Sequence, residues 1–264
     1  MTVGGVVECR MRSSRLPGKM LQEVMPGFTL LDAVVLRARK SRRLEKVVVA
    51  TTVEGTDNPI VAHCRNRGYP VFRGSEDDVL ARTLAACDAH GIDVLSRLTG
   101  DNPFVDGAAI DDLIAFWEAG AYDYACTTLM GHSANWIAER TFPRGVSMEV
   151  LRVELLKRVE PEIALPLERQ SPTFFIYDRP ERFRLGAFLA EGAYAAWRHP
   201  ELRMTVDTAD DLELARRLLA ELAPGDPAGF STGAAIALLA ARPDLQAINA
   251  HVQHNVISQM KVTT

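Results

Sequence analysis

The sequence has no long apolar run and no paired cysteines. None of its 264 residues belongs to an apolar stretch near the ~20 residues that a membrane helix requires. The first residues lack the basic segment, apolar core and small-residue cleavage site of a secretory signal. The four cysteines show neither a CxxC pair nor zinc-like spacing; they are Cys9, Cys64, Cys87 and Cys126. With 47% hydrophobic and 24% charged residues, we expect a soluble cytoplasmic protein with free thiols and no membrane partner.

An excess of positive charge and the common catalytic motifs are also absent. The formal net charge of −4 argues against a nucleic-acid partner, because proteins that bind nucleic acids usually carry a broad basic surface. The histidines show no HExxH or other ligand spacing, which argues against zinc chemistry. No GxSxG motif and no Cys/His arrangement indicates a covalent nucleophile. A local cluster of basic residues in this chain is therefore expected to bind a local anion.

One such cluster follows the first predicted strand, Val3–Glu8. Four basic residues, two hydroxyls and a glycine fall within ten positions: Arg10, Arg12, Ser13, Ser14, Arg15, Gly18 and Lys19. Arginine binds phosphate oxygens through paired hydrogen bonds, and lysine, hydroxyls and loop N–H groups add further contacts. A solvated basic loop is the alternative, but the position after a strand favours a polyphosphate site. The loop matches neither GxxxxGK[ST] nor GxGxxG, which disfavours a P-loop NTPase and a simple dinucleotide-binding protein.

Strand-like and helix-like segments alternate through about the first 110 residues. The predicted strands are Val3–Glu8, Lys46–Thr51, Tyr69–Arg73 and Asp93–Leu98, and the predicted helices are Thr29–Arg42, Pro59–Gly68, Val79–His90 and Ile110–Ala119. This alternation is typical of βαβ units and predicts an α/β fold with a mainly parallel sheet. Such sheets bind ligands at the carboxyl ends of their strands.

The second half of the chain is less regular. Residues 122–200 form a predicted insert with a strand-like stretch at Val146–Val150, which we interpret as a lid or oligomer arm. A further strand is predicted at Leu202–Val206 and an amphipathic helix at Leu212–Leu222. The last predicted helix covers residues 232–241, and a tail follows it.

Two aspartates follow predicted strands directly. Asp101 comes after Asp93–Leu98, and Asp207 comes after Leu202–Val206. Carboxylates at the carboxyl ends of neighbouring strands can share one hard divalent cation with a triphosphate, which suits phosphoryl or nucleotidyl transfer. Each aspartate taken alone is more typical of a helix cap or turn. Their joint occurrence with the basic loop favours the metal site.

The insert contains a second polar group. Its members are Arg144, Glu149, Glu168, Arg169 and Gln170. Arg144 and Arg169 could bind a substrate carboxylate. An ion pair with Glu149 or Glu168 inside the protein is the alternative.

Seven segments resemble one known family. They are RMRSSRLPGK (10–19), VVVATT (47–52), VFRGSEDDVLAR (71–82), RLTGDNPFVD (97–106), FPRGVSMEV (142–150), ERQSPTFFIYDRPERFRLG (168–186) and LRMTVDTADDLELAR (202–216). In this order and spacing they are similar to the cytidylyltransferase family that contains spore coat polysaccharide biosynthesis protein F. That family resembles the acylneuraminate and 3-deoxy-manno-octulosonate cytidylyltransferases. The resemblance covers most of residues 3–220.

The resemblance implies a fold and a reaction. The fold would be Rossmann-like and glycosyltransferase-A-like: a nucleotidyltransferase domain over residues 1–222, with an inserted β-arm or lid (about 122–200) for acceptor and dimer contacts, and a C-terminal helix and tail over 223–264. An acceptor oxygen would attack the α-phosphate of CTP with the help of Mg²⁺, and pyrophosphate would leave. The acceptor would be a sugar acid, or a related acid, phosphonate or polyol phosphate, in polysaccharide biosynthesis. The resemblance also implies a homodimer.

The resemblance further implies a role for each matching residue. The catalytic residues would be Arg10, Lys19, Asp101 and Asp207, and the two aspartates would bind Mg²⁺. The nucleotide would contact Arg10, Arg12, Ser13, Ser14, Arg15, Lys19, Thr52, Gly74, Ser75, Asp78, Arg82, Thr99 and Gly100. The acceptor would contact Arg144, Glu149, Arg169 and Gln170.

The chain departs from the family pattern at two places. Arg12 replaces a glycine, and it either adds a phosphate contact or occupies space that the base needs. Gln170 and Ser171 replace a glutamate and a histidine, so an acid and an imidazole are lost. Two alternatives therefore stay open: a nucleotidyltransferase that uses another NTP on a sugar phosphate, and a non-catalytic nucleotide-binding relative.

Overall fold

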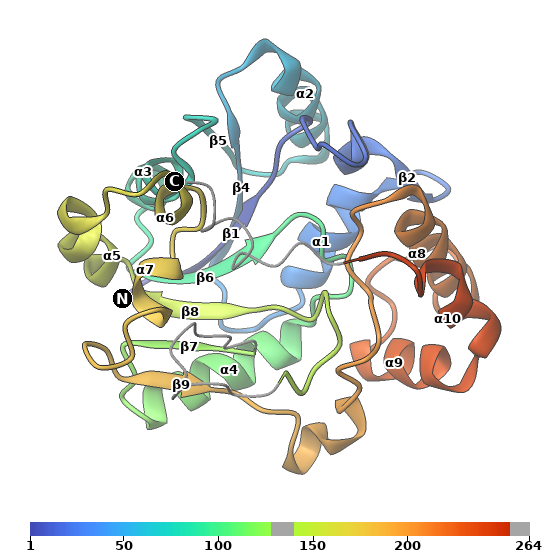
Figure 1. Cartoon of the computed structure of the whole chain (residues 1–264). Coiled ribbons are helices and arrows are strands. Elements are labelled where there is room, and N and C mark those ends of the chain that lie inside the picture. Colours follow the sequence, from blue (N-terminus) through green and yellow to red (C-terminus); the bar gives the residue numbers. More distant parts are fainter. Residues whose placement is uncertain (128–139, 254–264) are drawn as a thin grey trace.

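One mixed sheet forms the centre of the molecule. The structure, a computed structural model, describes residues 1–127 and 140–253. Seven strands lie in the order β5-β4-β1-β6-β8-β7-β9 (Figure 1). Their bounds are β1 Val3–Glu8, β4 Lys46–Thr52, β5 Val71–Gly74, β6 Val94–Thr99, β7 Tyr124–Cys126, β8 Glu149–Arg152 and β9 Leu185–Ala187. Strands β5, β4, β1 and β6 run parallel, β8 is antiparallel to both neighbours, and β9 is parallel to β7. The predicted α/β class with a mainly parallel sheet is confirmed.

Strand β1 lies in the middle of the parallel part, so the basic loop begins at the centre of the sheet edge. Its last residue, Glu8, is in register with Ala50 of β4 and with Thr99 of β6. The strands are apolar on both sides, because helices cover both faces of the sheet. The carboxyl ends of β1, β4 and β6 therefore meet where the predicted site residues are concentrated.

Helices pack on the two faces of the sheet. One face carries α1 (Leu30–Ala38), α2 (Asn58–Arg67) and α4 (Gly107–Ala119), and the other carries α3 (Val79–His90), α5 (Val153–Val159) and α7 (Phe174–Tyr177). Side-chain caps fix several helix starts; Asp78, for example, accepts a hydrogen bond from the N–H of Ala81 (2.8 Å) at the start of α3. Helix α3 has the bounds predicted from the sequence.

Several short elements connect the main ones. They are β2 Glu23–Met25, β3 Phe28–Thr29, α6 Pro166–Gln170, and the 3₁₀ helices η1 Lys19–Leu21, η2 Gly55–Asp57, η3 Glu160–Glu162 and η4 Gly192–Trp197. None was predicted, because elements of two to six residues are too short for a periodic signal.

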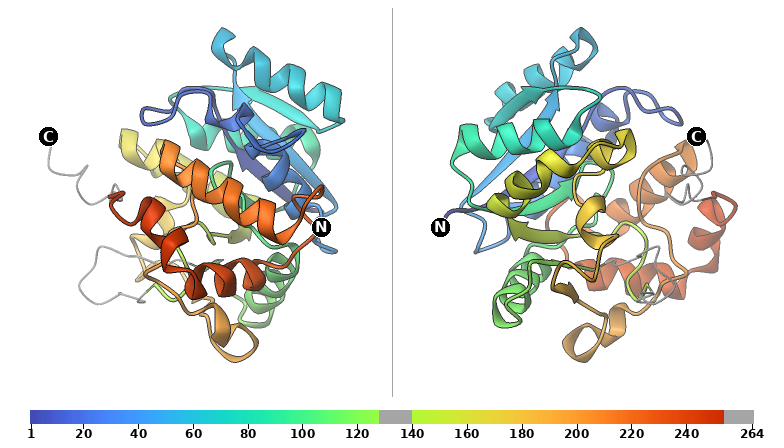
Figure 2. Two further views of the ribbon diagram at one scale, coloured as in Figure 1. Left: turned by 90° about the vertical axis from the view of Figure 1, so that its right-hand side faces the viewer. Right: turned by 60° about the vertical axis from the view of Figure 1, so that its left-hand side comes forward.

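Three helices near the C-terminus return to the N-terminal part of the chain (Figure 2). They are α8 (Ala209–Leu222), α9 (Thr232–Ala241) and α10 (Pro243–Asn249). Arg216 on α8 donates to the carbonyl oxygen of Glu23 on β2 (2.8 Å). Helix α9 has the predicted bounds, but α10 lies where a tail was expected. Pro243 occupies the first position of α10, where proline is well tolerated.

The predicted strand Leu202–Val206 does not join the sheet, and this prediction is wrong. Among the described residues, its one bridge pairs Arg203 with Arg144. The segment is extended and buried, but its backbone bonds to loops: Met204 N–H donates to the carbonyl of Arg144, and Val206 N–H donates to the carbonyl of Asp101 (2.8 Å). The segment therefore holds Asp207 beside Asp101 without a strand partner.

The insert contributes β7, β8 and β9 to the main sheet. Strand β8 covers Glu149–Arg152 rather than the predicted Val146–Val150. Residues 128–139, part of the predicted β-arm, lie outside the described residues. Within the described part of the chain, no helix has both the length and the apolar character needed to cross a membrane.

Candidate active site

The basic loop after β1 is closed by its own backbone. The N–H of Gly18 donates to the carbonyl of Met11 (2.9 Å), and the N–H of Lys19 donates to the carbonyl of Leu16 (3.3 Å). Gly18 has a φ of +74°, in the left-handed region that disfavours a β-carbon. This turn directs the chain into η1, where the side chain of Lys19 is buried.

A buried carboxylate from η2, Asp57, ties the loop to the end of β4. Its Oδ1 accepts the N–H of Met11 (2.8 Å). Its Oδ2 accepts the hydroxyl of Thr51 (2.8 Å) and both the hydroxyl (2.6 Å) and the N–H (3.1 Å) of Thr52. Burial acts to raise the pKa of Asp57, but these hydrogen bonds outweigh it and hold the pKa below its ordinary value. Asp57 thus fixes the loop as a charged acceptor.

Replacing Asp57 by Asn should loosen this attachment. Either orientation of the amide turns an NH₂ group toward existing donors, which should cost about 1–3 kcal/mol of the free energy of unfolding. Denaturant unfolding measures that cost, and titration with a nucleoside triphosphate should show weaker binding. Thr51→Val is the matched control, because it removes one donor to Asp57 but leaves the Met11 contact. Equal triphosphate affinity in the wild type and Asp57→Asn would contradict the assigned role.

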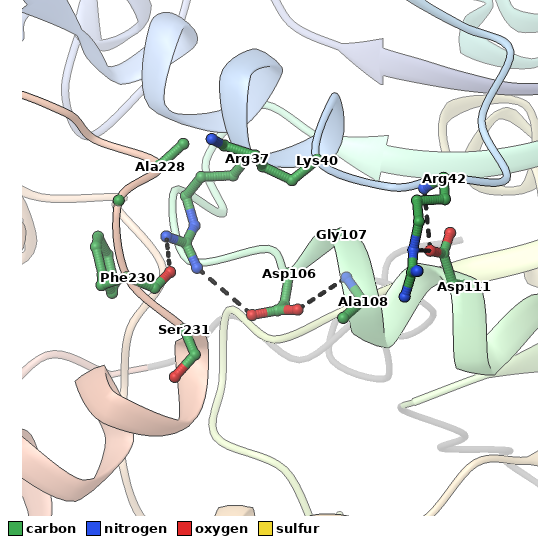
Figure 3. Close-up of a pocket in the computed structure, with 11 residues that line it drawn as sticks. Arg37, Lys40, Arg42, Asp106, Gly107, Ala108, Asp111, Ala228, Phe230 and Ser231 are labelled. Carbon is green, nitrogen blue, oxygen red and sulfur yellow. Dashed lines mark hydrogen bonds and ion pairs between the residues drawn. The ribbon is translucent and has the colours of Figure 1, made fainter.

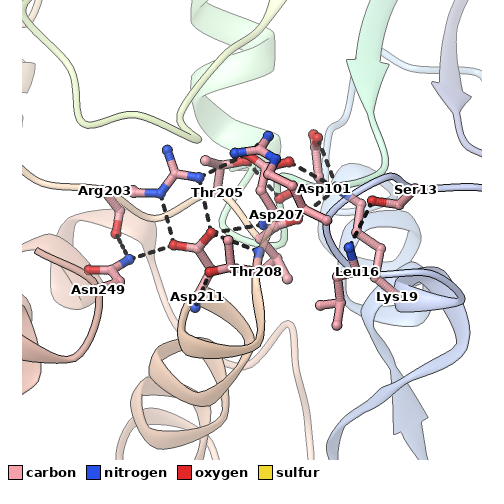
Figure 4. Close-up of polar contacts among 12 residues, drawn as sticks. Ser13, Leu16, Lys19, Asp101, Arg203, Thr205, Asp207, Thr208, Asp211 and Asn249 are labelled. Atoms are coloured by element: carbon pink, nitrogen blue, oxygen red, sulfur yellow. Dashed lines mark hydrogen bonds and ion pairs between the residues drawn. The ribbon is translucent and has the colours of Figure 1, made fainter. Parts of the chain in front are cut away.

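The ammonium group of Lys19 joins the two predicted carboxylates (Figure 4). Its Nζ lies 3.4 Å from Oδ2 of Asp101 and 3.1 Å from Oδ1 of Asp207, and it donates to the carbonyl of Val206 at 2.8 Å. Asp101 follows β6, and Asp207 follows the extended segment 202–206. The two aspartates therefore converge on one positive charge at the carboxyl edge of the sheet.

Two arginines share the other oxygen of Asp207. Oδ2 lies 3.0 Å from Nη2 of Arg15 and 2.8 Å from Nη2 of Arg203. Burial acts to raise the pKa of Asp207, but Lys19, Arg15 and Arg203 together lower it below its ordinary value. The carboxylate is therefore ionised and held in one orientation.

A cavity of about 340 Å³ opens beside this cluster. Its walls are Glu8, Cys9, Arg10, Arg12, Ser13, Ser14, Arg15, Lys19, Met20, Val79, Arg82, Thr99, Gly100, Asp101 and Gln170. The predicted loop residues thus share one cavity with a metal-site candidate and with an acceptor-site candidate. Arg12 also forms an ion pair with Glu76 (3.0 Å), and 61% of its side chain is exposed, which places it at the outer rim.

Arg82 is, with Lys19, a buried cation of this cavity. It is 3% exposed, and its Nη1 donates to the carbonyl of Ser75. Its Nε is buried and has no hydrogen-bond partner within the described part of the chain. Burial lowers the pKa of Arg82, and the carboxylate of Glu8 partly offsets this shift. A buried donor with no acceptor is unfavourable, and an anionic ligand in the cavity would supply the acceptor.

Four of the predicted nucleotide residues do not line the cavity: Thr52, Gly74, Ser75 and Asp78. Thr52 bonds to Asp57, and the hydroxyl of Ser75 accepts the N–H of Asp78 (3.0 Å). A β-carbon at Gly74 would lie 2.8 Å from Cγ of Arg82, so this glycine permits close packing of Arg82. A direct role for these residues toward a nucleotide stays a prediction.

The predicted acceptor residues are only partly brought together. Gln170 lines the cavity, whereas Arg169 forms ion pairs with Asp78 (2.9 Å) and Glu160 (3.3 Å). Glu149 pairs with Arg97 (2.7 Å). Burial and Arg203 lower the pKa of Arg144, whose Nη1 is buried without a hydrogen-bond partner. Within residues 1–127 and 140–253, neither Arg144 nor Arg169 therefore pairs with Glu149 or Glu168, as the alternative interpretation proposed. Glu168 pairs with Arg179 (2.9 Å).

A buried ion network beneath the cavity was missed by the sequence analysis. Arg97 on β6 donates to both oxygens of Glu8 (2.9 and 2.7 Å) and to Glu149 (2.7 Å), and Thr83 on α3 donates to Glu8 (2.8 Å). Burial alone would lower the pKa of Arg97, but Glu149 and Glu8 raise it. An arginine inside the apolar strand DVLSRL was the available signal.

A second cavity, of about 480 Å³, lies between α1, α4 and residues 228–231 (Figure 3). Its charged groups are largely occupied within the protein. Arg37 donates to Thr232 (2.7 Å) and to the carbonyls of Val105 (2.8 Å) and Phe230 (3.0 Å), and Asp106 caps α4. Asp111 accepts from Ser41 (2.5 Å). The cavity beside the basic loop is the better ligand site.

The residues at the cluster fit a hard divalent cation. Two carboxylates already converge on one positive charge there, and carboxylate oxygens are the ligands that Mg²⁺ prefers. Among residues 1–127 and 140–253, no group of three or more His, Cys, Asp or Glu side chains gathers as a metal site. The protein would thus supply two ligands, as in sites where Mg²⁺ is also held by substrate phosphates and water.

Three comparisons with known proteins agree. Residues 5–228 match the family model described as cytidylyltransferase. The chain is 35% identical over 246 residues to spore coat polysaccharide biosynthesis protein SpsF of Bacillus subtilis, which covers 90% of this chain and 94% of that one. A solved cytidylyltransferase structure from Leptospira borgpetersenii superposes with a TM-score of 0.82 at 27% identity, over 97% of this chain and 99% of that one. A CMP:2-keto-3-deoxy-manno-octonic acid synthetase complexed with CTP shares the fold alone (TM-score 0.59, 19% identity, 84% and 99% covered).

Proposed function

The chain belongs to the cytidylyltransferase family and is a nucleotidyltransferase, and from that premise we propose that it joins CMP from CTP to an acid acceptor and releases pyrophosphate. The observation that carries the proposal is the cluster of Lys19, Asp101 and Asp207 beside a cavity lined by the basic loop. Nucleotidyl transfer needs the triphosphate held in line and its developing charge neutralised. The cations of the basic loop and the neighbouring carboxylates for a metal meet both needs.

The chain's own residues would act as follows. Arg10, Arg15 and Lys19 bind the β- and γ-phosphates, with Ser13 and Ser14 donating further hydrogen bonds. An acceptor oxygen forms a bond to the α-phosphorus while the bond from that phosphorus to the bridging oxygen of pyrophosphate breaks. The basic loop stabilises the charge that collects on the leaving pyrophosphate.

Asp101 and Asp207 would hold Mg²⁺. When bound, the ion neutralises phosphate charge and helps to orient the triphosphate. Arg82 has a buried Nε without a partner and faces the same cavity, so it suits a phosphate or base acceptor of the nucleotide.

The acceptor in this proposal is a sugar acid or a related acid, phosphonate or polyol phosphate. Relatives named 3-deoxy-manno-octulosonate cytidylyltransferase support an acid; one from Chlorobaculum parvum is 38% identical over 133 residues, 49% of this chain and 51% of that one. Gln170 is the acceptor candidate that lines the cavity, whereas Arg144, Glu149 and Arg169 do not line it. A cytoplasmic homodimer remains part of this proposal.

Pyrophosphate release tests the proposed function. The protein is incubated with each of the four NTPs, Mg²⁺ and a panel of sugar acids, phosphonates and polyol phosphates. We expect release with CTP and an acid acceptor, and its loss when EDTA removes the metal. Preferred release with GTP or UTP and a sugar phosphate would favour the alternative of a nucleotidyltransferase that uses another NTP. Binding of CTP without turnover on any acceptor would favour a non-catalytic relative.

A further inference from the structure

One side chain of the C-terminal helix α10 contacts the residues that hold Asp207, a candidate metal ligand. Asn249 is the last residue of α10 and is 4% exposed. Its Nδ2 donates to Oδ1 of Asp211 (2.8 Å) and to the carbonyl of Arg203 (3.2 Å). Both amide hydrogens are therefore used, and each goes to a residue that lies beside Asp207.

Asp211 is the centre of this support (Figure 4). Its Oδ2 accepts the N–H groups of Asp207 (2.9 Å) and Thr208 (3.0 Å), and its Oδ1 accepts from Asn249. Burial acts to raise the pKa of Asp211, but Arg203, Asn249 and the N–H of Asp207 lower it. The carboxylate of Asp211 thus fixes the backbone at Asp207 and Thr208.

Arg203 links Asp211 to the side chain of Asp207. Its Nε and Nη2 bind the two oxygens of Asp211 (2.8 and 3.0 Å), and Nη2 also binds Oδ2 of Asp207 (2.8 Å). The guanidinium is planar, so fixing it on Asp211 also fixes its contact with Asp207. Asn249 holds this arrangement at two points, the carboxylate of Asp211 and the backbone of Arg203.

We propose that Asn249 is a positioning residue, which through Asp211 and Arg203 sets the carboxylate of Asp207 in the orientation that a divalent cation requires. The inference rests on the proposed function, in which Asp207 is a metal ligand. It makes α10 part of the active site, although no residue of α10 lines the cavity. Residues that orient metal ligands typically change metal affinity or activity by about 10–100-fold when replaced.

The test compares Asn249→Ala with Gln246→Ala. Gln246 is a matched control on the same helix, because its Nε2 also donates twice, to the carbonyls of Leu239 (2.9 Å) and Ala240 (3.1 Å), but it does not contact Asp211. The unreactive analogue α,β-methylene-CTP is titrated into each protein by calorimetry over a series of Mg²⁺ concentrations. We expect the half-saturating Mg²⁺ concentration to rise by about 10–100-fold in Asn249→Ala and to stay at the wild-type value in Gln246→Ala.

Turnover provides a second measurement. Excess Mg²⁺ should restore the turnover rate of Asn249→Ala. It could not restore the rate of a variant that had lost its fold. Asn249→Leu keeps much of the side-chain volume but has no donor, and it should show the same shift if the alanine variant does not fold. An unchanged Mg²⁺ dependence in Asn249→Ala, or the same shift in Gln246→Ala, overturns the inference. If the wild type binds the analogue equally well with and without Mg²⁺, the metal assignment itself is wrong.

Discussion

Asp207→Asn should lower turnover by roughly 10³-fold or more while leaving the fold intact. The substitution removes the charge that a divalent cation needs, and a metal that stabilises the transition state by several kcal/mol accounts for a loss of that size. It also leaves Lys19, Arg15 and Arg203 with one fewer counter-charge. Pyrophosphate release at saturating Mg²⁺ measures the loss, and circular dichroism checks the fold.

A neighbouring aspartate provides the control for this prediction. Asp210 is 51% exposed at its side chain and pairs with His251 rather than with the Lys19 cluster. Asp210→Asn should therefore keep wild-type turnover. Asp101→Asn should resemble Asp207→Asn, because Asp101 is the second carboxylate beside Lys19. Full activity in both the Asp101 and the Asp207 variant would show that the metal assignment is wrong.

Arg97→Met should cause the largest loss of stability. Arg97 is the buried partner of two carboxylates, Glu8 and Glu149, with N···O distances of 2.7 Å to each. Methionine fills much of the space but leaves both carboxylates uncompensated, which typically costs about 3–5 kcal/mol. Denaturant unfolding at neutral pH measures this cost.

Two further variants separate charge from packing at this network. Adding Glu8→Gln and Glu149→Gln to Arg97→Met removes every charge of the network, so much of the stability should return. Arg182→Met breaks an exposed ion pair with Glu162 (2.8 Å) and should change stability little. A loss in Arg97→Met no larger than that in Arg182→Met would show that the buried network contributes little to stability.

The sequence predicted the elements that carry a strong local signal. Helix α3 has an acidic cap and a clear apolar period, and the basic loop is visible from its charge density alone. The segment Leu202–Val206 has the residue types of a strand, yet whether it joins the sheet depends on its neighbours in space. Those neighbours are the loops at Asp101 and Arg144.

The supporting residues could not be predicted for the same reason. Arg97 and Glu8 are 89 positions apart, and Met11 and Asp57 are 46 apart, so no local pattern links them. Asp57 in a polar loop resembles an ordinary turn residue. A buried arginine or aspartate indicates that partners exist, but only the fold shows which ones.

The contact between Lys19 and Val206 also constrains when the site can form during synthesis. The two residues are 187 positions apart. At a translation rate of about 5–20 residues per second, roughly 10–40 s separate the basic loop from its acidic partner. Closing so long a loop costs entropy that only the completed chain can recover. A nucleotide that needs this contact therefore cannot guide early folding, because it can stabilise the protein only after Val206 has been made.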